Sequence, residues 1–96
     1  MKTEQLLQVL DADRAVRKEG KGTYVVEDDV ELTLMVDMGH EVLSVSRVRR
    51  LQLQPDLLTV ETHKGERIYL GADTTVRGLK FTEPEGRKLP STGFMR

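Results

Sequence analysis

The sequence predicts an α+β fold that is mostly β, with an N-terminal helix followed by five or six antiparallel strands in meander order. Three observations support this fold class. Apolar residues recur at helical spacing within residues 3–19, they alternate with polar residues from Tyr24 onward, and glycine-containing turns divide the alternating part at intervals of roughly ten residues. Strands of this kind are typical of a strongly curled sheet or a small open barrel, which the helix would cap.

Residues 3–19 have the pattern of an amphipathic helix. The apolar positions form one stripe, which consists of Leu6, Leu7, Val9, Leu10, Ala15 and Val16. Arg17 and Lys18 fall in the last turn, where they complement the helix dipole, and Gly20 can end the helix in a left-handed conformation. We expect the stripe to cover the core; the alternative is a face that binds a partner.

A hairpin with a two-residue turn is predicted in the middle of the chain. Pairing Val36 with Leu43 aligns the apolar residues of both strands on one face, and Leu34 then lies opposite Val45. The turn in this register begins with Gly39, and glycine in that place indicates a type II′ turn.

A second hairpin is predicted with a three-residue turn. Pairing Val60 with Ile68 aligns its apolar face and leaves a loop that ends at Gly65, where such loops need a left-handed residue. The same register places Glu61 opposite Arg67 on the outer face, which is a favourable cross-strand pair.

Two further features follow from the same alternation. Tyr69 of the second hairpin lies on the outer face, opposite Thr59. A last strand over residues 75–81 carries Gly78 at the point where its apolar residues are out of phase, which indicates a β-bulge.

The length of 96 residues predicts a single small domain over residues 1–82, with strands from about residue 24 to residue 81. Prolines and glycines then indicate a flexible tail over residues 83–96. This tail contains the sequence LPSTG, which matches the pentapeptide cut by sortase transpeptidases. Only FMR follows it, and the start of the chain holds no apolar run of a secretion signal. We therefore expect a tail rather than an anchoring signal; the alternative is a short docking peptide.

Composition narrows the classes of function. The chain has 15 basic and 16 acidic residues, a net charge of -1, so it has no general attraction to nucleic acid or to a membrane. It contains no cysteine, and no stretch approaches the roughly 18–20 apolar residues that span a bilayer. We expect a cytoplasmic protein that does not contact membranes.

Residues suited to catalysis do not form a recognisable set. Both histidines, His40 and His63, fall in predicted turns, and neither has the spacing of a metal-binding helix. No nucleophile elbow and no phosphate-binding glycine loop occur, and the acidic run over residues 27–31 lacks the alternating ligands of a calcium loop. We predict a non-catalytic protein with no metal site and no cofactor.

The strongest concentration of charge is the segment SRVRRLQLQ, which holds three arginines within four residues. The predicted binding residues are these three and two arginines on later strands: Arg47, Arg49, Arg50, Arg67 and Arg77. Planar guanidinium groups suit carboxylates and phosphates. The alternative is that the arginines protect a strand edge and pair with Glu61 and Glu66.

A regular strand cannot expose all of these arginines. Arg47 and Arg49 share the odd-numbered parity of the apolar residues Val45, Leu51 and Leu53. Regular alternation would therefore bury both guanidinium groups in the core. We predict a bend or bulge over residues 46–50 that turns Val48 inward and the arginines outward.

These features predict a small protein-interaction or adaptor module, which binds a protein partner through its arginine-bearing strand, its exposed sheet edge or its tail. Because a chain of this size with few aromatic residues has a small core, the alternative architecture is a sheet that completes its core through a homodimer. The alternative function is a regulatory module that binds nucleic acid or a phosphorylated ligand through the arginine cluster. The balanced net charge and the few aromatic residues weigh against nucleic acid.

Overall fold

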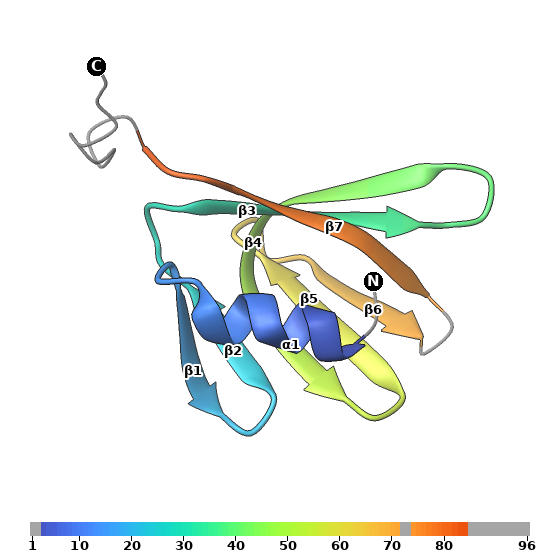
Figure 1. Cartoon of the computed structure of the whole chain (residues 1–96). Helices are drawn as coiled ribbons and strands as arrows, with labels where there is room; N and C mark the ends of the chain where they lie inside the picture. Colours follow the sequence, from blue (N-terminus) through green and yellow to red (C-terminus); the bar gives the residue numbers. More distant parts are fainter. Residues whose placement is uncertain (1–2, 72–73, 85–96) are drawn as a thin grey trace, which may run out of the picture.

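The computed structural model describes residues 3–71 and 74–84. Within these residues, one helix precedes seven strands of an antiparallel sheet that is not closed into a barrel, which confirms the predicted fold class (Figure 1). The elements are α1 (Thr3–Ala12), β1 (Val16–Gly20), β2 (Thr23–Val26), β3 (Glu31–Asp37), β4 (Val42–Gln54), β5 (Leu57–Thr62), β6 (Arg67–Gly71) and β7 (Thr75–Thr82). No helix in this part of the chain has the length and apolar character needed to cross a membrane.

Strand β4 connects two halves of the sheet. Along one edge, its first part pairs with β3 and its second part with β2; along the other edge, it pairs with β5 from Val48 onward. Val48 itself lies between Leu32 of β3 and Thr62 of β5. The large half of the sheet consists of β1, β2, the second part of β4, β5 and β6, and the small half consists of β7, β3 and the first part of β4.

The strand order differs from the predicted meander, and the strands number seven rather than five or six in the described residues. Strands β2 and β3 are consecutive but do not pair with each other, because both run antiparallel to β4, one after the other along the same edge. The corner between them is a turn in which Val30 N–H donates to Glu27 O at 3.1 Å. The other edge of β3 pairs with β7. A strand as long as β4 can hold two shorter strands on one edge, and local alternation does not reveal this.

The prediction of a helix over residues 3–19 is wrong at the C-terminal end. The helix ends at Ala12, and Val16–Gly20 form β1, which pairs with β2. Asp13 accounts for the difference, because its Oδ1 accepts a hydrogen bond from Ala15 N–H at 2.8 Å. Aspartate that bonds a backbone N–H two residues later forms a turn that competes with continuing the helix.

Both predicted hairpins are confirmed. The predicted pairs that the structure contains are Val36–Leu43, Leu34–Val45, Val60–Ile68, Glu61–Arg67 and Thr59–Tyr69. Gly39 has a φ of 95° and Gly65 a φ of 86°, as the two turn types require. The bulge in β7 is confirmed as well, since Gly78 lies opposite Met35 and the register shifts at the next pair.

The core lies between α1 and one face of the sheet (Figure 1). Its buried residues are Leu6, Leu10, Ala15, Tyr24, Val26, Val30, Leu32, Leu34, Val36, Val45, Val48, Leu51, Val60, Leu70 and Val76. On β3 the buried residues occupy every second position, which is the burial pattern of a strand that packs one face against a core. From residue 85 onward, the predicted tail and its LPSTG sequence lie outside the described residues and stay a prediction.

Tyr24 joins the helix to the sheet. Its side chain is 1% exposed, and its hydroxyl donates to Asp11 Oδ1 at 2.9 Å. Burial, together with the hydrogen bond to Asp11, raises the pKa of Tyr24 above the ordinary tyrosine value. The folded state therefore holds the phenol proton more tightly than the unfolded state does.

Tyr24→Phe should lower the free energy of unfolding by about 1 kcal/mol at neutral pH, because the protein loses one hydrogen bond while the exposed Asp11 stays solvated. Since the folded-state pKa is raised, the contribution of Tyr24 is complete below the unfolded-state pKa of about 10 and falls as the pH rises beyond it. Urea unfolding of the parent and the variant across this pH range checks the expectation. The stability difference between them should narrow above about pH 10; a constant difference would contradict it.

Candidate binding site on the outer face of the sheet

Two irregularities in β4 decide where its arginines point. Opposite β3, Val48 pairs with Leu32 and Val45 with Leu34, so β4 has an extra residue between these pairs. At this bulge Arg47 has a φ of 58°, a left-handed conformation that is uncommon for residues other than glycine. Opposite β5, the pairs Val48–Thr62 and Arg50–Glu61 leave Arg49 as another extra residue. The predicted bend with Val48 turned inward is confirmed.

Arg49 and Arg50 point away from the core. Val48 and Leu51 are both fully buried, and between them Arg49 is exposed and Arg50 half-buried. Arg50 lies beside Glu61 of β5, which in turn lies beside Arg67 of β6. Side chains of residues paired across antiparallel strands share a face of the sheet. Three of the five predicted arginines are thus brought together on the outer face of the large half.

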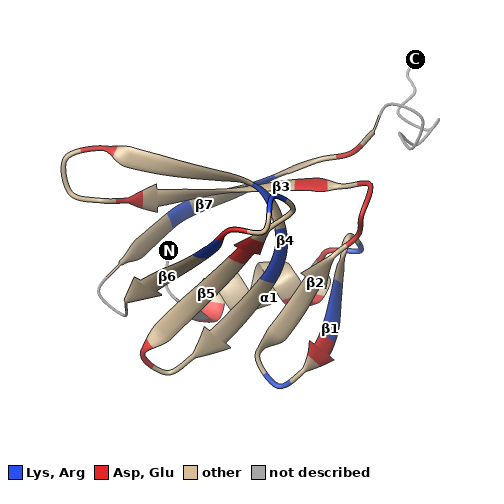
Figure 2. Cartoon of the chain, turned by 180° about the vertical axis from the view of Figure 1, so that it is seen from behind, with Lys and Arg blue, Asp and Glu red and all other residues tan. Residues whose placement is uncertain are grey.

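We call this surface the arginine face; its residues are Arg49, Arg50, Gln52, Thr59, Glu61, Arg67 and Tyr69. Tyr69 is 60% exposed. It pairs with Thr59 of β5, which in turn pairs with Gln52 of β4, so these three residues form a second row across the face. Figure 2 looks onto this side and shows basic segments of β4 and β6 on either side of an acidic segment of β5.

The guanidinium groups of the arginine face are not engaged in ion pairs within residues 3–71 and 74–84. Arg17 by contrast forms an ion pair with Glu19 at 2.9 Å on the edge strand β1, and the hydrogen bond to Glu19 raises the pKa of Arg17. Glu61 lies between two arginines without an ion pair to either of them. Its carboxylate lowers the mutual repulsion of the neighbouring arginines and leaves their donors available.

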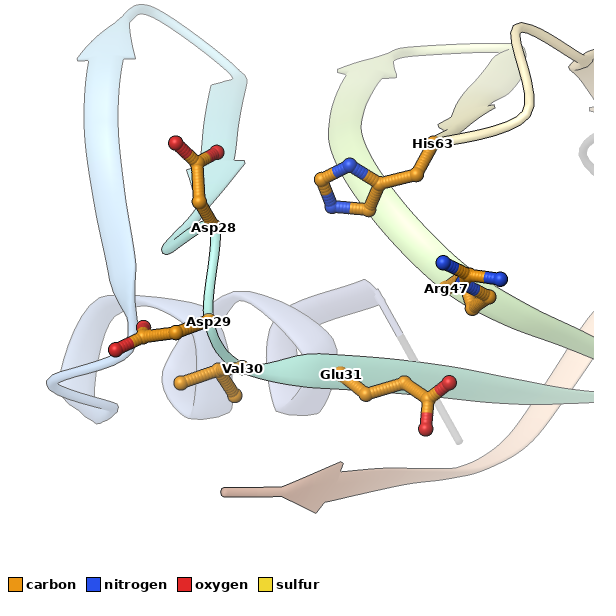
Figure 3. A pocket seen from close by; sticks show the side chains of 6 residues that line it. All are labelled: Asp28, Asp29, Val30, Glu31, Arg47 and His63. Atoms are coloured by element: carbon orange, nitrogen blue, oxygen red, sulfur yellow. The ribbon is translucent and has the colours of Figure 1, made fainter. Parts of the chain in front are cut away.

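The other two predicted binding residues lie elsewhere. Arg77 belongs to the bulge in β7, in the small half of the sheet. Arg47 lies in a pocket of about 220 Å³ whose lining residues are Asp28, Asp29, Val30, Glu31, Arg47 and His63. In Figure 3, Arg47 and His63 reach this pocket from β4 and from the β5–β6 turn, while Asp29 points away from them. The acidic residues that line this pocket come from the β2–β3 corner and the start of β3, so Arg47 lies apart from the arginine face.

Among the described residues, no three histidine, aspartate or glutamate side chains gather closely enough to hold a metal ion.

A further surface is the open edge of β4, which comprises the residues between the β3–β4 turn and the bulge at Arg47. There β4 pairs with β3 on one side, and no described strand pairs with it on the other. A groove of about 310 Å³ follows this edge; it is lined by Leu43, Ser44, Val45, Ser46, Lys64, Glu66 and Ile68.

Tyr69 is not among the predicted binding residues, although its alternation with Ile68 and Leu70 predicts its exposure on the outer face. The position of His63 beside Arg47 depends on the bulge in β4 and has no signal in the sequence. No protein-family model matches this chain, and comparisons with curated proteins and with solved structures find no similar one.

Proposed function

We propose that this protein is a non-catalytic protein-interaction module that binds an acidic segment of a partner on the arginine face. The observation that carries the proposal is the row Arg50–Glu61–Arg67, in which two guanidinium groups flank one carboxylate without forming an ion pair. Guanidinium groups bind carboxylates through two parallel hydrogen bonds, and such charge-assisted bonds are stronger than neutral ones.

The composition of the face also suits a protein partner. Arginine and tyrosine are the residues that contribute most often to binding energy at protein interfaces, and Tyr69 is exposed beside the row of charges. The threonine and glutamine side chains around it can form hydrogen bonds at the rim. A partner segment with spaced carboxylates would match both arginines while avoiding Glu61.

The double variant R50Q/R67Q tests this function. A series of fluorescently labelled peptides with spaced aspartates and glutamates serves as the probe, and fluorescence anisotropy at low salt measures the Kd. We expect the parent to bind members of the series and the variant to bind them at least about tenfold more weakly, because two charge-assisted contacts are lost. Glutamine keeps polarity and most of the side-chain length, so lost packing contributes little.

The matched control is R77Q/K80Q, which removes the same charge from exposed residues of β7. Its Kd should stay within about twofold of the parent value, since general attraction between exposed charges is weak and screened. Equal weakening by the two double variants would contradict a site on the arginine face and indicate attraction by net charge.

A phosphorylated ligand or a nucleic acid is the second candidate, and the exposed Tyr69 favours it because an aromatic ring on a sheet can stack with a base. Salt separates the two functions. Binding of an oligonucleotide should weaken steeply as salt rises, because neutralised phosphates release counterions. Tighter binding of a single-stranded oligonucleotide than of any acidic peptide, with that steep salt dependence, would favour the second candidate.

A further inference from the structure

We infer that a second copy of this chain occupies the open edge of β4, so that two β4 strands pair antiparallel about a two-fold axis near Ser44. The inference uses a different surface from the arginine face and does not rest on the proposed function.

Backbone groups along the open edge are placed to bond another strand. Met38 N–H donates to Glu41 O at 2.9 Å, which makes these two residues a hydrogen-bonded pair of the β3–β4 ladder. Bonded and non-bonded pairs alternate along an antiparallel ladder, so Leu43 bonds to β3 and its neighbours Val42 and Ser44 do not. The N–H and C=O groups of Val42 and Ser44 therefore point toward the open edge.

Space for the added strand begins where β5 ends. His63 N–H donates to Arg47 O at 3.0 Å, and beyond this bond the described part of the chain provides no strand on that edge of β4. The groove beside this edge is lined on the β4 side by the residues that precede Arg47, from Leu43 to Ser46. An unpaired edge beside a groove is the geometry in which proteins accept an added strand.

The edge is complementary to itself in charge. Residues 41–47 begin with Glu41 and end with Arg47, so antiparallel pairing about Ser44 brings each Glu41 near the partner's Arg47. Arg47 is exposed and makes no ion pair within the described residues, which leaves its guanidinium group able to turn toward the partner's Glu41. The two-fold axis makes this contact twice.

Exposed apolar side chains gather on the β3–β4 hairpin, whose second strand carries the open edge. Four large hydrophobic side chains are exposed in the described residues, and three of them lie here: Met38 at 50%, Val42 at 44% and Leu43 at 41%. Pairing about Ser44 places Leu43 beside the partner's Val45 and Val42 beside the partner's Ser46. The dimer would remove part of this apolar surface from water, which is a favourable contribution to association.

Charge reversal tests the dimer. Sedimentation velocity over a range of concentrations should show that the parent chain dimerises, whereas E41R alone and R47E alone associate at least about tenfold more weakly, because like charges meet at both contact points. An equimolar mixture of the two variants restores opposite charges at both points, so it should dimerise like the parent. Variants that fail to fold could not give this rescue.

Three results would overturn the inference: a parent chain that stays monomeric at every concentration, single variants that dimerise as well as the parent, or a mixture that does not recover association.

Ser44→Pro gives a second measurement that does not depend on charge. It removes an N–H that faces the open edge, a place where strands tolerate proline. This variant should keep the melting behaviour of a folded domain and lose dimerisation, and a folded S44P chain that dimerises normally would also overturn the inference.

Discussion

Gly22→Ala should destabilise the protein by about 2–5 kcal/mol, because two unfavourable effects combine at this position. Gly22 has a φ of 76°, which favours glycine, and a Cβ at this position would lie 2.5 Å from Leu53 O. The contact cannot relax by moving a side chain, since Leu53 O is a backbone atom and Leu53 N–H donates to Gly22 O at 2.7 Å. The turn between β1 and β2 therefore lies directly against the end of β4.

Thermal unfolding measures this effect, with a fall in Tm of roughly 4–8 °C for each kcal/mol in a domain of this size. Gly20→Ala is the matched control, because it adds the same methyl group two residues earlier, where no atom lies within 4 Å and φ is not positive. It should change stability by about 0.5 kcal/mol or less. Similar melting curves for the two variants would mean that the turn does not pack against β4 as described.

Leu34→Ala should lower the free energy of unfolding by about 2–5 kcal/mol. Leu34 is 0% exposed and lies between Val45 of β4 and Leu79 of β7, so its removal leaves a cavity in the middle of the small half of the sheet. Neighbours on paired strands cannot close such a cavity without breaking backbone hydrogen bonds. Urea unfolding gives the stability of parent and variant from the midpoint and the slope.

Met35→Ala provides the control for this cavity. It removes the same number of side-chain heavy atoms from the adjacent residue, but Met35 is half-buried on the opposite face of β3. Its cost should be about 1 kcal/mol, because the site is open to water and little transfer energy is lost. Equal costs for the two substitutions would contradict the assignment of the core to one face of β3.

The hairpins could be predicted from the sequence because their determinants are local. The positions of Gly39 and Gly65 and the alternation of apolar residues around them agree on one register each. The end of the helix could not be predicted in the same way. Arg17 and Lys18 suit the last turn of a helix and equally suit an exposed edge strand, and pairing of β1 with β2 decides between them. The position of β2 along β4 depends on contacts between distant residues, which alternation does not encode.

The candidate site was predictable in part for the same reason. The conflict between Arg47 and its buried neighbours predicts a bulge from the sequence alone, and the register of the second hairpin places Arg67 on the outer face. The grouping of the arginines required the exact path of β4. The left-handed conformation of Arg47 turns it toward the acidic corner, while the second irregularity keeps Arg49 and Arg50 together on the outer face.

The pairing of β3 with β7 has a consequence for synthesis of the chain on the ribosome. Glu31 pairs with Thr82, so one edge of β3 has no partner until nearly the whole described sequence has emerged. The hairpins β3–β4 and β5–β6 join neighbouring segments and need only short loops to close, whereas docking of β7 closes a long one. A nascent chain would thus expose a hydrophobic strand with an unpaired edge during elongation, the state in which such strands associate with other chains.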